Sequence, residues 1–164
     1  MTDVFTKEKR SWIMSRIRGR DTKIDIRMRE ILTEMGCSFE AYPRMHGTPD
    51  FVLRRKRIIV YCDGDYWHGY GYWEKKKPVK KYWRDKIETN MRRDRRITRK
   101  FRRDGWSVLR FWEHDIEKKP DKCRRRILVK IREKKISEVR TGFLIPLPSS
   151  QTACAVKNYR KFSF

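Results

Sequence analysis

Two short apolar runs set the framework for any fold of this chain. Asp50 to Leu53 and Arg57 to Cys62 are rich in β-branched and aromatic residues, and only the basic segment 54–56 separates them. Runs of this length and composition are typical of β-strands, and so short a link favours a hairpin. The sequence therefore predicts an antiparallel pair of strands in the middle of the chain.

Apolar residues at helical spacing predict helices on both sides of this hairpin. The expected helices cover residues 6–18, 21–35, about 82–104 and 122–135. Asp21 is the expected N-cap of the second helix, and Gly36 follows its end, where glycine commonly ends helices. Gly105 closes the third helix in the same way.

Two further strands are expected over residues 37–42 and 106–112, and residues 63–73 are read as a glycine- and aromatic-rich loop. The resulting order, α-α-β-β-β-loop-α-β-α, favours an α/β sandwich with a mixed sheet. We expect residues 1–20 to form an N-terminal arm that contacts the ligand, 21–140 the main domain, and 141–164 a C-terminal tail.

The charge of the chain favours a polyphosphate partner. Among 164 residues, 44 are Lys or Arg and 21 are Asp or Glu, which gives a formal net charge of +23. Such a positive field suits nucleic acid, whereas thermal adaptation would pair Glu with the added bases. No stretch approaches 18 apolar residues and no apolar signal region opens the chain, so we expect a cytoplasmic, nucleoid-associated protein without a membrane partner.

Three aspartates border the hairpin. Asp50 opens its first strand, and Asp63 and Asp65 follow its second. Asp50 and Asp63 could therefore converge at one edge of the sheet, where two carboxylates and a backbone carbonyl would suit Mg²⁺. Such an ion polarises a phosphodiester and activates water. The competing interpretation is turn chemistry, since Pro-Asp and Asp-Gly are common in turns.

A histidine and several aromatic residues follow the aspartates. His68 lies five residues after Asp63, where it could act as general base, or else it is a surface histidine packed on a tryptophan. A glycine-spaced loop cannot bury many rings, so Tyr66 and Trp67 are expected to stack on bases or wedge between them.

Residues 74–103 form a basic block with 15 Lys or Arg against four acids. Part of it is a solvated helix face, and part is expected to contact phosphates; the candidate contacts are Arg92, Arg93, Arg95 and Arg96. Asn90 and Asp94 lie one helical turn apart and share a face. Asp94 either pairs with the neighbouring arginines or holds a water near the metal and orients His68.

Five motifs in register resemble one known family. They are K-x-x-R-S-x-x-M-x-x-I-x-x-R-D-T-x-I, T-P-D-F-V, D-G-D-Y-W-H, W-x-x-K-I-x-x-N-x-x-R-D-R-R and G-W-x-V-L-R-F-W-E-H, running from about residue 3 to 115. In this order they are similar to the very short patch repair endonucleases. The resemblance implies a restriction-endonuclease-like three-layer α/β sandwich, with a central mixed sheet flanked by helices, and a Mg²⁺-dependent strand nick at a T·G mismatch in DNA repair.

The resemblance also implies roles for single residues. Asp50 matches the metal-binding aspartate, the backbone carbonyl of Cys62 a further metal ligand, and His68 the catalytic histidine. Asp25 stands where the family has a glutamate near the active site. The implied DNA contacts are Tyr66, Trp67 and Trp83, which match intercalating aromatic residues, together with Met14, Ile17 and Arg20 of the N-terminal arm, Asn90, and the arginines named above.

The chain departs from the family pattern at two places. Asp63 replaces the histidine before the glycine, which makes the site more like the two-carboxylate pattern of phage and intron-encoded nicking nucleases. The loop zinc ligands are replaced by Asp65, Tyr70, Tyr72 and His114, and the four cysteines show no metal-binding spacing. We therefore expect no structural zinc and a loop held by packing, with the tail as one partner.

Three functions follow from these observations. The leading hypothesis is a Mg²⁺-dependent endonuclease, with Mn²⁺ as an alternative ion, that nicks double-stranded DNA at a mispaired or deaminated base. Asp50, Asp63 and Cys62 would hold the metal, with Asp65 and Asp94 in support. The alternatives are a sequence-specific nicking or homing-type endonuclease and a non-catalytic basic nucleic-acid-binding protein. Either a monomer or a dimer fits the sequence.

Overall fold

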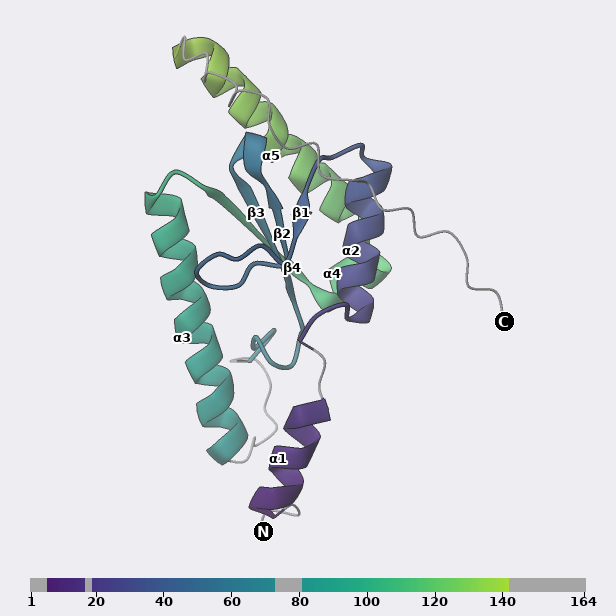
Figure 1. Ribbon diagram of the computed structural model, residues 1–164, viewed down its shortest axis with the longest axis vertical. Coiled ribbons are helices and arrows are strands. Elements are labelled where there is room, and N and C mark those ends of the chain that lie inside the picture. Colours follow the sequence, from purple (N-terminus) through teal and green to yellow (C-terminus); the bar gives the residue numbers. More distant parts are fainter. Residues whose placement is uncertain (1–5, 17–18, 73–80, 142–164) are drawn as a thin grey trace, which may run out of the picture.

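The computed structural model describes the chain at residues 6–16, 19–72 and 81–141. Figure 1 shows the elements in the order α1 (Lys7–Arg16), α2 (Lys23–Glu34), β1 (Glu40–Ala41), β2 (Phe51–Leu53), the 3₁₀ turn η1 (Arg54–Lys56), β3 (Ile58–Asp63), α3 (Lys81–Arg103), β4 (Ser107–Trp112), α4 (Glu113–Lys118) and α5 (Pro120–Thr141).

The strands form one mixed sheet in the order β1-β2-β3-β4. The predicted hairpin is confirmed: β2 pairs antiparallel with β3, and Phe51 lies opposite Val60. The turn between them closes at Arg57, which adopts a left-handed conformation with φ of 50°. β4 adds in parallel to β3, with Tyr61 in register with Arg110. This parallel pairing requires the long crossover that α3 supplies.

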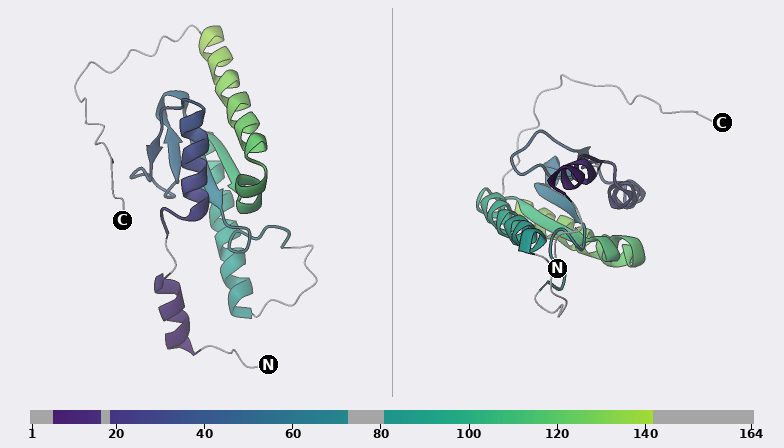
Figure 2. Two further views of the ribbon diagram at one scale, coloured as in Figure 1. Left: turned by 90° about the vertical axis from the view of Figure 1, so that its right-hand side faces the viewer. Right: turned by 90° about the horizontal axis from the view of Figure 1, so that it is seen from below.

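Helices cover both faces of the sheet, which makes three layers. α2, α4 and α5 lie on one side and α3 on the other (Figures 1 and 2). Successive residues of a strand point to opposite faces. Ile58 and Val60 accordingly join the core beside α2 and α5, whereas Ile59 and Tyr61 pack with Phe101 of α3. Because both faces are covered, β2 and β3 are apolar almost throughout.

The start of α2 differs from the prediction by one residue. Asp21 is not the N-cap: it has a left-handed φ of 50°, and Thr22 caps the helix. The Thr22 hydroxyl accepts from the Asp25 backbone N–H at 3.4 Å, and the Asp25 carboxylate accepts from the Thr22 backbone N–H at 3.0 Å. This reciprocal capping box satisfies two N–H groups, whereas an Asp21 cap would satisfy one. Gly36, with φ of 64°, ends the helix as expected.

Three further predictions about the elements also differ from the structure. The strand expected over 37–42 is reduced to β1, because Tyr42 adopts a left-handed φ of 49° that ends the extended segment, although its N–H still donates to the Asp50 carbonyl at 2.8 Å. α4 was not expected, since six residues are too few to show a helical period. The last helix, expected over 122–135, runs from Pro120 to Thr141, and the fixed φ of proline suits its first position.

Some expectations remain untested by this structure. The tail at 142–164, Ile17 and Trp73 lie outside the described residues, and the three-part division of the chain stays a prediction. Within the described ranges, none of the helices combines the length and apolar character that a bilayer-spanning segment needs.

Neighbouring residues on α5 provide a test of how this helix docks. Ile127 is fully buried, whereas Leu128 is 41% exposed. Ile127→Ala should lower the free energy of unfolding by about 2–5 kcal/mol through lost burial and cavity formation, and Leu128→Ala should change it by about 0.5 kcal/mol or less. Urea denaturation measures both, and equal losses would contradict this placement of α5.

Candidate active site

A cleft of about 610 Å³ opens where the β2–β3 hairpin, the loop after β3 and the middle of α3 meet. Most of the predicted catalytic and metal-binding residues line it: Asp25, Asp50, Cys62, Asp63, His68 and Asp94. Residues that are far apart in the sequence are therefore gathered at one end of the sheet.

Asp50 is held by the hairpin itself. It immediately precedes β2, and its Oδ2 accepts a hydrogen bond from the backbone N–H of Cys62 on β3 at 2.8 Å. Asp25 approaches from the first turn of α2, where Thr22 and the Tyr42 hydroxyl also donate to its carboxylate. One ligand atom from each of Asp25, Asp50 and Cys62 lies within 4.8 Å of the other two. The structure thus places Asp25 beside Asp50 in a group that could hold a metal ion.

The electrostatics of this group favour a bound cation. Burial raises the pKa of Asp50 to about 7, and the negative charges of Asp25 and Asp63 act in the same direction, although the Cys62 N–H opposes them. Burial also raises the pKa of the Cys62 thiol well above its usual value. A neutral thiol is a poor ligand for a hard cation, so the two carboxylates are the donors that suit Mg²⁺. A divalent ion would relieve their mutual repulsion.

Asp63 makes a different contact from the one the sequence suggested. Its carboxylate is 3% exposed and accepts from Arg110 twice, from Nε to Oδ2 and from Nη2 to Oδ1, both at 2.6 Å. The register of β3 with β4 explains the pairing, since Tyr61 lies opposite Arg110 and the alternation of side chains points Arg110 and Asp63 to the α3 face. The structure therefore pairs Asp63 with Arg110 and groups Asp25 with Asp50.

Sequence reasoning missed Arg110. The residue stands inside the apolar strand W-S-V-L-R-F-W, and a single cation in a buried strand is the signal that could have revealed it. A charge in such a position is costly unless it is paired and hydrogen-bonded.

His68 lies next to this ion pair. Its Nδ1 is 2.6 Å from Asp94 Oδ2 and 3.4 Å from Asp63 Oδ1, and Arg110 Nη2 is 3.2 Å from Asp94 Oδ2. Burial alone would raise the pKa of Asp94, but the hydrogen bond with His68 and the charge of Arg110 outweigh it, so the pKa is lowered. An ionised Asp94 can only accept, so His68 donates this hydrogen bond through Nδ1–H, and in that tautomer Nε2 is left as the proton acceptor.

Asp63, His68 and Asp94 also lie close enough to share one ion. The guanidinium of Arg110, however, already contacts both carboxylates of this group. The arrangement therefore resembles a histidine held by a charged partner more than a second metal site. Asp94 had two possible roles, pairing with the neighbouring arginines or orienting His68. Its carboxylate lies 2.6 Å from His68 Nδ1 but 3.9 Å from Arg93 Nε, which favours the contact with His68.

A ladder of aromatic rings borders the cleft. Tyr66 contacts Trp67 with ring centroids 4.9 Å apart, Trp67 contacts Trp83 at 5.5 Å, and Trp83 contacts Tyr82 at 4.8 Å. Tyr66 is 48% exposed. Asn90 supports the ladder, because its side-chain amide donates to the Trp67 carbonyl at 3.1 Å. The predicted DNA-contacting rings therefore form one continuous surface.

The rest of the aromatic loop is tied to the protein at its base. His114 Nδ1 lies 2.9 Å from both Asp65 oxygens, and the Tyr70 ring lies 4.2 Å from the His114 ring. Tyr72 donates to Glu88 on α3 at 3.0 Å. Asp65 thus pairs with His114 at the start of α4, and the residues at the family's zinc-ligand positions hold the loop through these contacts.

The expected basic contacts are divided between surfaces. Arg93 lines the cleft, Arg92 and Arg96 are exposed elsewhere on α3, and Arg95 lines a neighbouring cleft. The guanidinium of Arg20 lies over the Tyr42 ring at 5.4 Å.

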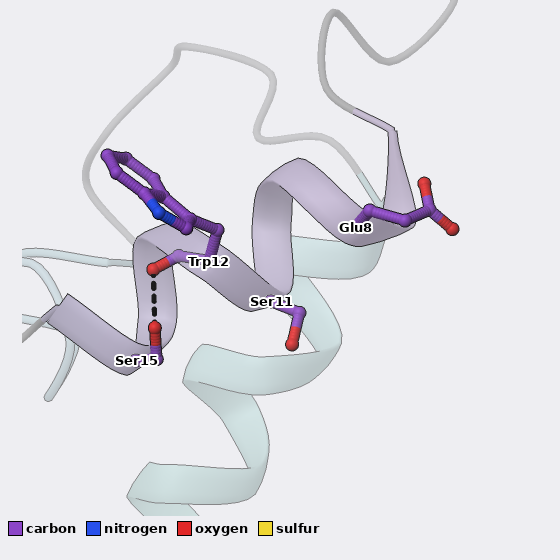
Figure 3. A pocket seen from close by; sticks show the side chains of 4 residues that line it. All are labelled: Glu8, Ser11, Trp12 and Ser15. Atoms are coloured by element: carbon purple, nitrogen blue, oxygen red, sulfur yellow. Dashed lines mark hydrogen bonds between the residues drawn. The ribbon is translucent and has the colours of Figure 1, made fainter.

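Met14 belongs to α1, which presents its own surface hollow. Figure 3 shows this hollow around Glu8, Ser11, Trp12 and Ser15, where the Ser15 hydroxyl donates to the Trp12 carbonyl at 2.8 Å. Trp12 is 52% exposed and lies near Lys9 and Arg16. All four lining residues come from one helix, so α1 offers an exposed ring between cations but no enclosed site.

The raised pKa of Asp50 predicts an unusual effect of its removal. Between about pH 4 and 7 the folded state keeps a proton that the unfolded state has released, so stability without metal falls as pH rises through this window. Asp50→Asn should therefore raise the metal-free melting temperature at pH 8, with the gain shrinking toward pH 4. Mg²⁺ should stabilise the unsubstituted protein at pH 8 but not the variant. Calorimetry measures this, and a variant that is less stable at pH 8 would contradict the electrostatics described above.

Known proteins match this chain in both sequence and fold. The model of the DNA mismatch endonuclease Vsr family matches residues 2–75, a span that includes Asp25, Asp50 and His68. The DNA mismatch endonuclease Vsr of Escherichia coli K12 is 36% identical over 116 residues, covering 69% of this chain and 74% of that protein. The type II nicking enzyme V.NmeDIP of Neisseria meningitidis serogroup C is 30% identical over 136 residues, covering 80% and 92%.

Among solved structures, the catalytic domain of the homing endonuclease I-Bth0305I matches with a TM-score of 0.50, covering 70% of this chain and 98% of that domain. At 21% identity this likeness shows the fold, which is restriction-endonuclease-like, as expected. The sequence relatives carry the assignment further: the chain belongs to the Vsr family of DNA mismatch endonucleases.

Proposed function

We propose that this protein is a Mg²⁺-dependent endonuclease that nicks one strand of double-stranded DNA at a mispaired base, either T·G or another product of base deamination. The observation that carries the proposal is the meeting of the Asp25–Asp50 pair with the His68–Asp94 pair in one cleft. The relatives, a mismatch endonuclease and a nicking enzyme, support the same chemistry. A strand nick needs only one such site, so one copy of the chain is sufficient.

Asp50 and Asp25 would hold the metal, with the Cys62 backbone carbonyl as a further ligand. The fit rests on two close carboxylates, with the pKa of Asp50 raised first by burial and then by the neighbouring charge of Asp25. Once bound, the ion would polarise the scissile phosphate and stabilise the charge that develops on it. In this arrangement Asp63 acts through its pairing with Arg110 instead of as a ligand.

His68 would take the proton of the attacking water on Nε2. Asp94 holds the Nδ1 proton, fixes the direction of the ring and stabilises the imidazolium that forms. Arg110 keeps Asp94 ionised, because its guanidinium lies 3.2 Å from the carboxylate. The contacts among His68, Asp94 and Arg110 would therefore fix both the tautomer and the orientation of the imidazole ring that a general base needs.

The aromatic ladder would open the base stack beside the cleft. Tyr66 and Trp67 are suited to insert between base pairs, with Trp83 supporting them from α3. A mispaired base is cheaper to unstack and unpair than a matched one. This difference in cost would direct the wedge, and hence the nick, to mismatches.

Cleavage of end-labelled duplexes tests the reaction directly. Matched DNA and DNA carrying T·G or U·G pairs would be incubated with Mg²⁺, with Mn²⁺ or with EDTA. We expect a single nick confined to a mispaired duplex and dependent on the divalent ion. Nicking of matched DNA at one sequence would instead identify a homing-type enzyme, and binding without cleavage under any ion would identify a non-catalytic binding protein.

Variants of the histidine pair test the assigned roles. His68→Ala should lower the rate of nicking by about 10²–10⁴-fold, the usual contribution of a general base, while mismatch binding in Ca²⁺ stays intact. Asp94→Asn should cause a smaller loss, because it removes only the group that orients the ring. Asp85→Asn provides the matched control, since Asp85 is an exposed acid on the same helix that lies 3.9 Å from Arg84 Nε and lines neither cleft. Full activity of His68→Ala would exclude this mechanism.

A further inference from the structure

A second cleft adjoins the active-site cleft. It has a volume of about 670 Å³ and shares four lining residues with the first: Asp63, His68, Asp94 and Arg110. Neither Asp25 nor Asp50 lines it. Beyond the shared residues, α3 and β4 supply most of its wall, so we call it the α3–β4 cleft. The histidine and its charged partners therefore stand between the proposed metal group and a separate cavity.

The α3 wall of this cleft is a row of arginines. Arg95, Arg99 and Arg102 follow one another at i, i+4 and i+7, so they share a helix face. Across the described ranges, no carboxylate forms an ion pair with any of the three, whereas nearby Lys100 pairs with Asp104 at 3.2 Å. With Arg110 the cleft holds four arginines against two aspartates. It is therefore a cationic cavity with unneutralised guanidinium groups.

Two buried polar atoms of the lining residues also have no hydrogen-bond partner among the described residues. They are Thr98 Oγ1 on α3 and Arg110 Nη1 on β4. Leaving a donor of this kind unsatisfied costs free energy, and a charged one costs more, so such atoms in native proteins call for an explanation. Both atoms belong to residues that line the cleft, and both are covered by neighbouring atoms. The row of unpaired arginines is therefore the surface that an anionic ligand would meet, with these two donors lying in the wall behind it.

We propose that the α3–β4 cleft binds a phosphate group, and that in the working enzyme this is a backbone phosphate of the DNA strand that passes His68. Guanidinium groups recognise phosphate through paired, charge-assisted hydrogen bonds. The identity of the source rests on the proposed nuclease function, whereas the phosphate chemistry rests on the cleft itself. Because Arg110 contacts Asp63 and Asp94 as well as this cavity, a phosphate held here fixes the strand against the histidine pair.

The first test compares two double variants of the full chain. Arg99→Gln/Arg102→Gln removes two guanidinium groups of the cleft, and Arg103→Gln/Arg125→Gln removes two exposed ones that line neither cleft. Binding of a mismatched duplex is measured in Ca²⁺ at several salt concentrations. The cleft variant should bind at least about 10-fold more weakly, and the slope of log K against log salt should fall by about 0.9, the value for one lost phosphate contact. In the control variant the salt slope should fall by less than half as much. If the slope fell equally in both double variants, the proposed contact between this cleft and a DNA phosphate would be rejected.

A second test identifies the source of the phosphate. Inorganic phosphate and a nucleoside 5′-monophosphate are titrated into the protein while NMR follows the indole of Trp112, which lines the cleft. Saturable shifts that Arg99→Gln/Arg102→Gln and Thr98→Val abolish would support the site. Saturable shifts without any effect on duplex binding would assign it to free nucleotides instead of DNA. No shift, together with equal duplex binding by the two double variants, would overturn the proposal.

These measurements do not depend on catalysis. DNA is expected to stay uncut in Ca²⁺, so failure to nick leaves the binding result readable. Circular dichroism melting checks that each variant folds. Thr98→Val replaces the hydroxyl with a methyl group of similar size. If Thr98 had only a structural role, this variant would bind phosphate as the unsubstituted protein does.

Discussion

The buried ion pair between Asp63 and Arg110 joins more parts of this molecule than any other contact described. It links β3 to β4, touches Asp94 on α3, and lies beside His68 in the aromatic loop. A buried charge is tolerated only when its partner is present and its hydrogen bonds are made. The parallel pairing of β3 and β4, the position of α3 and the orientation of the histidine therefore depend on one another. The same pair also forms the wall between the two clefts.

The molecule separates its charges in a way that suits a nuclease. Lys and Arg exceed Asp and Glu by 23 over the whole chain, yet Asp25 and Asp63 are buried and Asp50 is largely so, close to the active-site cleft. Asp63 is neutralised by an arginine, whereas Asp50 lies beside Asp25 without such a partner among the described residues, and burial together with the charge of Asp25 raises the Asp50 pKa. This excess negative charge, set within a basic protein that attracts phosphates, has a divalent cation as its natural counterpart. In the proposed function, basic residues would attract the DNA strand, and the carboxylates of Asp25 and Asp50 would attract the metal.

Local pattern was enough to predict most of the fold. The hairpin followed from two apolar runs and a three-residue turn, and α3 followed from apolar residues such as Ile97 and Phe101 at helical spacing. The misses have physical reasons as well. The capping box moved the start of α2 to Thr22, the left-handed conformation of Tyr42 shortened β1, and α4 is too short to show a period. The first two were decided by local conformation at a single residue, and the third lacked the length that a periodic pattern requires.

The sequence by itself determined the chemistry available to this protein: a hairpin edge carrying Asp50, a histidine five residues after Asp63, an aromatic loop and a basic helix, in motifs that identify the family. Only the tertiary structure decided which carboxylates act together. Asp25 comes from a helix 25 residues before Asp50, and Arg110 from a strand 47 residues after Asp63. Those contacts arise from the packing of α2 on the sheet and from the register of a parallel strand, both of which are set by burial of apolar faces. Neither the packing of α2 nor the register of β4 can be read from the spacing of residues along the chain.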